Sequence, residues 1–345
     1  MSVSESANRI LRDAHVLRAP VGPGQGYWTG APGVCYARDE QAFYVTYRIR
    51  RPRLPAALAK AGGAPPDRGG EARIARSTDL THFDDVWSVT KDAYDSPSIE
   101  RSAIRKGPDG AWRYFTSFVD PADGRWCVSV LKHSDVCRFD PSTAQRLFTA
   151  RPLGLEGVKD PWIFEDGGVY YMMLSVALRS DQTREESHAT LDIFNTGDCI
   201  SATGLARSRD LDAWEWLGVV FAPSASGWDA YCRRINSLAR HDGKHVAFYD
   251  GSASHLENDE EKTGLALSSD LQAWTTLTAR GPALTSPHAS GSLRYLDTVA
   301  TDECTWAFYE FARPDGAHDL RVARIDLSQL PISAGADPRA RIDGE

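Results

Sequence analysis

The chain has 345 residues, a hydrophobic fraction of 42% and a formal net charge of −8. This length is enough for one large core or two ordinary ones, and the negative charge does not indicate a nucleic acid or an anionic membrane as partner. No run of about 18 apolar residues predicts a membrane span, and the first residues lack the apolar core of a secretory signal. Six cysteines without a C-x-x-C pair favour free thiols and a cytoplasmic location.

A polar turn followed by an aromatic-rich strand recurs five times along the chain. Asp-Gly turns between apolar runs are typical of β-hairpins. A second motif, Asp-[Leu/Val]-x-x-[Phe/Trp], follows most copies after a further strand-like run. Each repeat is therefore strand, turn, strand, loop, strand, Asp-Leu turn, strand. The first turns begin at Asp39, Asp109, Asp166, Asp242 and Asp302, and the second motif begins at Asp79, Asp135, Asp210 and Asp270.

Five repeats of four strands predict an all-β protein, a five-bladed β-propeller of four-stranded antiparallel blades. A β-sandwich is the alternative, but five similar units in phase favour the propeller. We expect one domain over residues 1–330 and a flexible tail over 331–345, a segment rich in Pro, Ala, Gly and charge. The expected blades are roughly 26–90, 98–150, 158–222, 230–280 and 287–327.

The first strand of each propeller blade lines the central axis, so the residues that begin these strands should meet in one pocket. We expect the loops at about 51–70 and 178–200 to rim the same face, where binding residues are common. In chain order, the residues expected in or near this pocket are Trp28, Arg48, Glu100, Arg101, Lys159, Asp160, Trp162, Tyr231, Arg233, Arg234, His288 and Glu310.

Two carboxylates and a histidine across a narrow axis are what acid–base chemistry on a sugar requires. We expect Glu100 to be the proton donor, Asp160 to be the base or to stabilise positive charge at the anomeric carbon, and His288 to be the third catalytic residue. The other residues would bind substrate through aromatic stacking and through cationic groups. Because alternate residues of a strand face opposite ways, at most one of Arg233 and Arg234 should point inward.

Each of these residues also has a purely structural interpretation. Asp160 could cap a turn, Glu100 could form a surface ion pair, and His288 could lie at the rim. The tryptophans could pack between blades. The position of Asp160 within the repeat favours the functional interpretation for that residue.

Two segments, DPWIFEDGGVYYMMLS at 160–175 and GLALSSDLQAW at 264–274, resemble blade motifs of the five-bladed glycoside hydrolases. That broad group holds families 32, 43, 62, 68, 117 and 130, and the resemblance covers about residues 26 to 327. It implies the propeller fold and an activity on glycosides, without a close match to one family.

Family 43 enzymes carry an Asp-Pro in the first blade as base, where this chain has Ala31-Pro32. Their second blade carries an Asp and their third a Glu, whereas this chain has Glu100 and Asp160. The usual base is therefore missing and the other two carboxylates are exchanged in type.

Family 130 includes cytosolic phosphorylases that split mannosides with inorganic phosphate. It resembles this chain at Tyr47-Arg48, at Glu100 and at Lys159-Asp160. Family 117 members use a histidine as acid, which the resemblance would assign to His288.

These observations predict a cytoplasmic enzyme that acts on a small glycoside or sugar-like substrate by carboxylate acid–base chemistry. Three alternatives are a phosphate-dependent phosphorylase, a non-hydrolytic lyase, cyclase or isomerase, and a sugar-binding protein without activity; Ala31 favours the last two. A protein-interaction propeller is less compatible with matched inner carboxylates. No cofactor is required, although the resemblance leaves an axial Ca²⁺ or a bound phosphate open, and the oligomeric state is not predicted.

Overall fold

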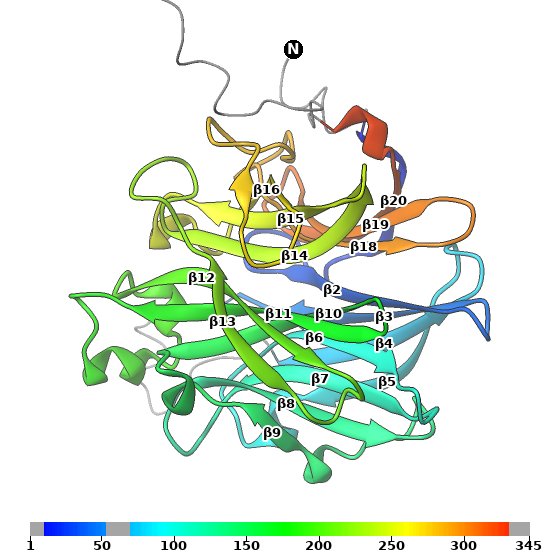
Figure 1. Cartoon of the computed structure of the whole chain (residues 1–345), viewed down its shortest axis with the longest axis horizontal. Coiled ribbons are helices and arrows are strands. Elements are labelled where there is room, and N and C mark those ends of the chain that lie inside the picture. Colours follow the sequence, from blue (N-terminus) through cyan, green and yellow to red (C-terminus); the bar gives the residue numbers. More distant parts are fainter. Residues whose placement is uncertain (1–9, 53–69, 331–345) are drawn as a thin grey trace, which may run out of the picture.

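The structure, a computed structural model, describes residues 10–52 and 70–330, and these are built almost entirely of β-strands (Figure 1). Helical structure in these ranges is limited to seven short 3-10 segments. The prediction of an all-β protein is confirmed. The expected tail at 331–345 and most of the predicted rim loop at 51–70 lie outside the described residues.

Successive strands pair antiparallel in groups of four, which we call units one to five. Unit one holds β2 (Trp28–Ala37), β3 (Ala42–Arg50), β4 (Glu71–Ser77) and β5 (Asp84–Thr90), and unit two holds β6 (Ile99–Lys106), β7 (Trp112–Val119), β8 (Trp126–His133) and β9 (Gln145–Phe148). Unit three holds β10 (Gly157–Asp166), β11 (Val169–Arg179), β12 (Cys199–Ser208) and β13 (Glu215–Phe221), and unit four holds β14 (Cys232–His241), β15 (Lys244–Ser252), β16 (Lys262–Ser268) and β17 (Thr275–Thr276).

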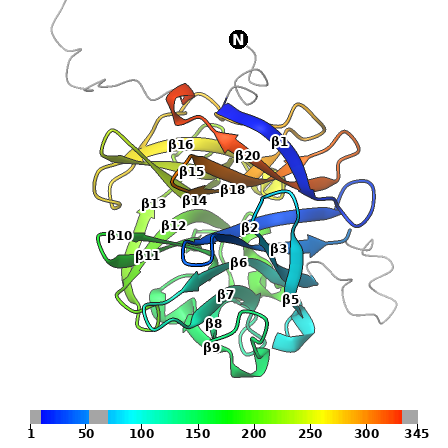
Figure 2. The ribbon, with the colours of Figure 1, turned by 90° about the vertical axis from the view of Figure 1, so that its right-hand side faces the viewer.

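Unit five combines the two ends of the described chain. It holds β18 (Leu293–Ala300), β19 (Thr305–Ala312), β20 (His318–Ile325) and, as its fourth strand, the N-terminal β1 (Leu11–Arg18). Figure 2 shows β1 lying along β20. This pairing covers the edge of the last unit, which would otherwise expose unpaired backbone groups.

The repeated turns explain why the chain folds into these units. Gly167 and Gly168 both have positive φ between β10 and β11, as a type I′ hairpin turn requires. In the Asp-Leu motif, one carboxylate oxygen of Asp210 accepts backbone hydrogen bonds from the two residues that follow Leu211. Leu211 itself is buried with a φ of 68°, and its carbonyl accepts a hydrogen bond from Trp214 Nε1.

Apolar clusters join neighbouring units and form the core. Separate buried clusters link unit one to two, two to three, three to four, four to five, and five back to one. The contacts between neighbouring units therefore run from unit one through unit five and back to unit one. Because each unit buries both faces against its neighbours, the first strands of all five units face a common centre.

Every first strand carries a β-bulge in its first half. A bulge sets two residues against one on the partner strand and redirects their side chains. Three of the residues in these bulges, Ala31, Asp160 and Tyr295, have positive φ. The register shifts lie between Gly30 and Gly33, Ile99 and Ser102, Lys159 and Trp162, Ile235 and Ser237, and Arg294 and Asp297.

Candidate active site

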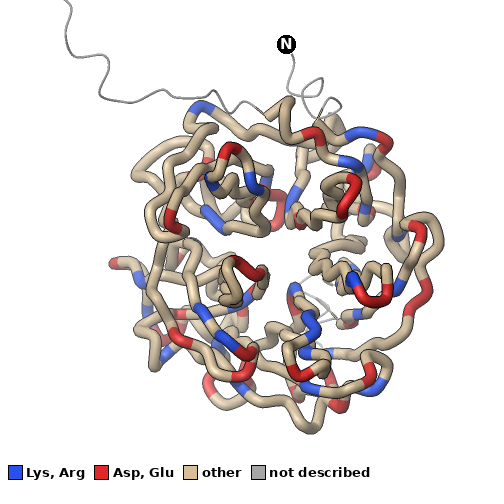
Figure 3. Tube along the Cα trace, turned by 45° about the vertical axis from the view of Figure 1, so that its right-hand side comes forward, with Lys and Arg blue, Asp and Glu red and all other residues tan. Residues whose placement is uncertain are grey.

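The five bulges surround a dense group of buried charged residues, which we call the axial cluster. Figure 3 shows that charges of both signs cover the outer turns of the molecule and also occur near its centre. Buried charges are costly unless they are paired, and they gather preferentially at functional sites. The axial cluster consists of Arg48, Arg50, Glu100, Lys159, Asp160, Arg234, Asp250, Glu261, Arg294, Tyr295 and Glu310, each less than a tenth exposed.

Two strand positions supply most of the axial cluster. The bulges contribute Glu100, Asp160 and Tyr295 from units two, three and five, and Ala31 takes the same position in unit one. The residue pairs before the bulges contribute six more: Lys159 on β10, the cross-strand pairs Arg234 with Asp250 and Arg294 with Glu310, and Arg48 opposite Gly30. Arg50, opposite Trp28, and Glu261, just before β16, complete the cluster.

Glu100 is held between two guanidinium groups. It forms ion pairs with Arg48 and with Arg50, and all three side chains are buried. Burial, and after it the nearby Arg50, lower the pKa of Arg48 to about 10. A carboxyl group between two cations interacts best in its ionised form. This environment suits an electrostatic role better than the role of proton donor that we expected from the sequence.

Asp160 is the carboxylate with the fewest contacts in the axial cluster. Neither of its carboxylate oxygens has a hydrogen-bond partner among the described residues, although both are buried. The nearest cations are Lys159 Nζ at 3.5 Å and Arg234 Nη1 at 4.0 Å. Burial alone would raise the pKa of Asp160, but Lys159, Arg234 and more distant arginines outweigh it and lower the pKa. An ionised carboxylate with free oxygens is therefore aimed into the cluster.

Lys159 lies beside that carboxylate on an aromatic platform. Its ammonium group is 5.1 Å from the ring centre of Trp126 and 4.8 Å from that of Phe194. Burial lowers the pKa of Lys159 to about 8, despite the opposing effect of Asp160. The cation–π contacts hold the amine in place without neutralising it.

Units four and five close the cluster with a chain of ion pairs. Arg294 bonds Glu310 at 2.7 and 3.0 Å and Glu261 at 2.7 Å, and Glu261 also pairs with Arg234. Asp250 accepts the backbone N–H of Tyr295. Burial, and then the charge of Glu261, raise the pKa of Asp250 to about 7.

Trp28 forms an aromatic edge of the same group. Its ring stacks on His318 at 4.9 Å, and the guanidinium groups of Arg50 and Arg294 lie 5.6 and 5.0 Å from it. A cavity of about 300 Å³ borders Trp28, Arg50 and Asp259. This cavity is the described opening nearest to the cluster.

The structure brings seven of the twelve sequence-predicted residues together. Asp160, Glu100, Lys159, Arg48, Arg234, Glu310 and Trp28 all lie in or against the axial cluster.

The remaining five lie elsewhere. Arg233 pairs with Asp229 and donates to Ser224, away from the cluster, so only one arginine of the pair points inward. The hydroxyl of Tyr231 donates to the carbonyl of Phe194. His288 lies in the turn before β18, beside Phe311, and is not among the residues that meet at the bulges.

Arg101 and Trp162 lie deeper along the axis and join all five units. Arg101 donates to Pro32 O at 2.7 Å, to Asn236 O and Oδ1 at 3.2 Å, and to Asp297 Oδ2 at 3.3 Å. Trp162 Nε1 donates to the other oxygen of Asp297 at 2.7 Å. We call these five residues, one from each unit, the axial plug.

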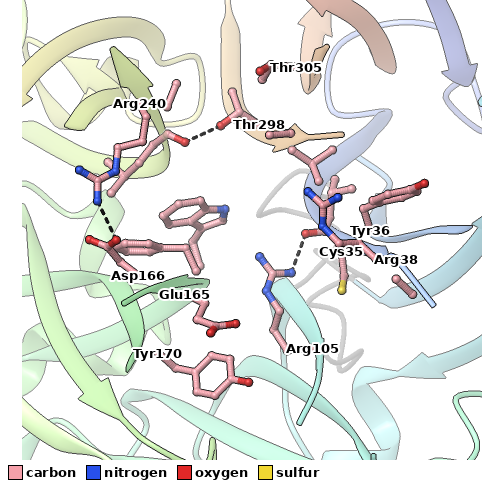
Figure 4. Close-up of a pocket in the computed structure, with 18 of the residues that line it drawn as sticks. Cys35, Tyr36, Arg38, Arg105, Glu165, Asp166, Tyr170, Arg240, Thr298 and Thr305 are labelled. Carbon is pink, nitrogen blue, oxygen red and sulfur yellow. Dashed lines mark hydrogen bonds and ion pairs between the residues drawn. The ribbon is translucent and has the colours of Figure 1, made fainter. Parts of the chain in front are cut away.

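A second cavity near the axis lies on the other side of the plug. It measures about 690 Å³ and is bordered by the ends of the first strands. Figure 4 shows Arg105, Glu165, Asp166, Tyr170 and Arg240 around it, and Arg240 is paired with Asp166 at 2.6 Å. We place the candidate site at the axial cluster rather than in this larger cavity, because the cluster holds the unpartnered carboxylate.

Sequence reasoning missed Arg50, Asp250, Glu261, Arg294 and Tyr295. The position of the turn could have found the last of these. The first bulge residues of units one, two and three, Ala31, Glu100 and Asp160, lie eight, nine and six residues before their turns, and Tyr295 lies seven before the turn at Asp302. The segment around His288 lies too far upstream of that turn to begin the strand.

No group of three or more His, Cys, Asp or Glu side chains is arranged to hold a metal ion within residues 10–52 and 70–330. The same ranges contain no helix with the length and apolar character of a membrane span.

Comparison with known proteins places this fold among carbohydrate-active enzymes. A thermostable family-43 glycoside hydrolase superposes with a TM-score of 0.59 at 12% identity, covering 90% of this chain and 92% of its own. The β-1,2-mannobiose phosphorylase from Listeria innocua gives 0.59 at 13% identity, with coverage of 92% and 98%. An endo-arabinase from Bacteroides thetaiotaomicron gives 0.55 at 13% identity, with coverage of 90% and 98%.

At these identities the similarity establishes the fold alone. No protein-family model matches the sequence, and no curated protein matches it. The protein therefore has the fold shared by family-43 glycoside hydrolases and related hydrolases and phosphorylases, without a close relation to one family.

Proposed function

We propose that this protein is a five-bladed propeller enzyme that acts on a small glycoside or sugar-like substrate in the axial cluster. The five units are its blades, and β1 closes the ring by completing unit five. The observation that carries the proposal is Asp160, a buried carboxylate with both oxygens unpartnered among the described residues, held by a bulge among charged groups from all five units. The similarity to glycoside hydrolases and a phosphorylase supports this class of substrate.

The roles follow from the electrostatics of the cluster. Asp160, whose pKa is lowered, is the base or the group that stabilises positive charge at the anomeric carbon. Glu100 fixes the positions of Arg48 and Arg50. The proton donor must be a carboxyl group that keeps its proton near neutral pH, and Asp250 is the cluster carboxyl with this property.

A panel of nitrophenyl glycosides tests the proposal. Wild-type protein should release nitrophenol from at least one arabinoside, xyloside or mannoside, and Asp160→Asn should lower kcat on that substrate by about 10²–10⁴-fold, the usual contribution of an acid–base group. Asp242→Asn, in the exposed turn between β14 and β15, is the matched control and should retain activity. Full activity in folded Asp160→Asn would exclude the assigned role.

A second candidate function is phosphorolysis, which the cations of the axial cluster favour. Arg48, Arg50, Lys159, Arg234 and Arg294 are all buried in this one cluster, and guanidinium and ammonium groups are the usual ligands of phosphate. Activity that depends on inorganic phosphate and yields a sugar phosphate would identify this reaction. Activity that is unchanged without phosphate would exclude it.

A non-hydrolytic reaction is the remaining alternative, and Ala31 is the observation that favours it. Ala31 occupies in unit one the bulge position that Asp160 occupies in unit three. Among the described residues, the unit-one bulge therefore supplies no carboxylate that could activate water. Product analysis by mass spectrometry distinguishes the cases, because hydrolysis adds the mass of water and isomerisation does not. The free thiols of the chain support a cytoplasmic location for either reaction.

A further inference from the structure

Tyr295 occupies the same place in unit five that Asp160 occupies in unit three. Both lie at the first position of a first-strand bulge, with φ of 52° and 54°. A positive φ is costly for a residue other than glycine, and such strain gathers at functional sites. The side chain of Tyr295 is buried, and its neighbours are the charged residues of the axial cluster rather than apolar ones.

Three guanidinium groups fix the ring of Tyr295. Arg294 lies 5.2 Å, Arg48 5.7 Å and Arg101 5.9 Å from the ring centre. These arginines belong to units five, one and two, so the ring is held from several directions at once. A phenol positioned in this way loses little further conformational freedom when a ligand binds.

Burial and nearby charges act on the Tyr295 hydroxyl, and no hydrogen bond to another described residue contributes. Buried tyrosine hydroxyl groups usually find a hydrogen-bond partner, and those of Tyr114, Tyr231 and Tyr249 bond Ser102, Phe194 O and Asp229 respectively. The hydroxyl groups of Tyr94 and Tyr309 also lack such a partner among the described residues, but both residues lie in apolar clusters between units. An unpartnered hydroxyl among charges is instead placed to meet a polar ligand.

The electrostatics keep this hydroxyl protonated. Burial, followed by the negative charge of Asp160, raises the pKa of Tyr295, and this outweighs the opposite effect of Arg48, Arg294 and Arg234. The phenol is therefore a hydrogen-bond donor at neutral pH. The surrounding guanidinium groups polarise the O–H bond toward an acceptor that carries negative charge.

We propose that the Tyr295 hydroxyl donates a hydrogen bond to a sugar oxygen of the bound substrate, opposite Asp160, and so selects substrates that carry an acceptor at that position. Tyr295 is thus a specificity-determining residue of the site. This inference rests on the proposed function, since it takes the axial cluster as the sugar-binding site.

A binding cycle tests the inference. The probes are xylose, arabinose, mannose, galactose and glucose, followed by the singly deoxygenated analogues of the sugar that binds most tightly, measured by calorimetry. Tyr295→Phe should weaken binding of that sugar by about 5–10-fold, the range of one hydrogen bond. One analogue, lacking the contacted oxygen, should bind wild type and Tyr295→Phe equally, whereas the other analogues should retain the difference.

The matched control is Tyr309→Phe, which removes the hydroxyl of a buried tyrosine in the apolar cluster between units four and five. It should leave all sugar affinities unchanged. An equal loss by Tyr295→Phe for every analogue, or no loss at all, would overturn the inference while leaving the proposed function intact.

A crystal structure of the free protein provides a readout that does not depend on sugar binding. We expect an ordered water molecule hydrogen-bonded to the Tyr295 hydroxyl and shared with Asp160, marking the position of the substrate oxygen. A hydroxyl bonded directly to a protein acceptor would overturn the inference. Water at this position together with no affinity for any sugar would refute the proposed function and leave Tyr295 as the donor to a ligand of another class.

Discussion

Asp160 and Asp250 are buried carboxyl groups of one cluster whose surroundings move their pKa values in opposite directions. Lys159 and Arg234 lower the pKa of Asp160 against the effect of burial, whereas burial and Glu261 raise that of Asp250 to about 7. Separated pKa values within a site allow one group to accept a proton while the other holds one. The two residues lie in different units, so this division arises only in the folded chain.

The raised pKa of Asp250 predicts a dependence of stability on pH. A carboxyl group whose pKa is raised by folding stabilises the protein while it is protonated, and the contribution is lost as pH rises from about 4 toward 7. Asp250→Asn has no such titration. The variant should therefore gain stability relative to wild type over this window, by at most about 4 kcal/mol, because one pKa unit corresponds to about 1.4 kcal/mol.

Urea unfolding of both proteins at pH 4, 5.5, 7 and 8 measures this difference. Titrating groups that do not interact with Asp250 cancel in the comparison, and the difference reports the titration of Asp250 together with its neighbour Glu261. A constant difference between wild type and Asp250→Asn across the series would show that the pKa of Asp250 is not raised.

At the scale of the element, the bulge in each first strand determines what the axis contains. Regular pairing would alternate side chains between the two faces of each unit, where apolar residues pack against the next unit. The bulge instead sends Asp160 and Tyr295 toward the centre. One residue further along, Arg101 uses the same irregularity to reach units one, four and five.

Arg101 should therefore be important for stability rather than for chemistry. Arg101→Ala leaves the buried Asp297 without its cation, and breaking a buried ion pair costs about 3–5 kcal/mol. The free energy of unfolding should fall by this amount, as measured by urea titration. Arg207→Ala, which removes an exposed arginine paired with Glu215 on an outer strand, is the control and should change little. Equal effects of the two substitutions would contradict the structural role of the plug.

The regular parts of each element could be predicted from the sequence, and the irregular parts could not. The Asp-Gly and Asp-Leu turns have local chemical signatures, so the strands around them were expected at the right places. A bulge has no such signature when its residues are as different as Ala31, Glu100 and Tyr295. Asp160 was predicted from its place within the repeat. The corresponding position of unit five was assigned to His288, whereas the structure has Tyr295 there.

The charged residues around the site could not be predicted from local sequence patterns either. Glu261 ends the acidic run 257–261, a composition typical of a solvated loop, yet its side chain is buried between Arg234 and Arg294. Its partners lie 27 and 33 residues away along the chain. Only the closed arrangement of units brings such residues into contact.

At the scale of the whole molecule, the axial plug divides the centre into two mouths with different chemistry. One mouth holds the axial cluster with the unpartnered Asp160, and the other is the larger cavity of about 690 Å³. Size alone would favour the second mouth as the binding site, whereas the unpartnered buried groups favour the first. The roles proposed for Asp160, Asp250 and Tyr295 all require substrate to bind in the first mouth.

Crystals soaked with the sugar that binds most tightly, and separately with inorganic phosphate, test that requirement most directly. We predict density for the sugar at the axial cluster, with a hydroxyl that accepts a hydrogen bond from the Tyr295 hydroxyl and donates one to Asp160. Sugar bound only in the cavity lined by Arg105, Tyr170 and Arg240, with the axial cluster unchanged, would contradict the placement of the active site.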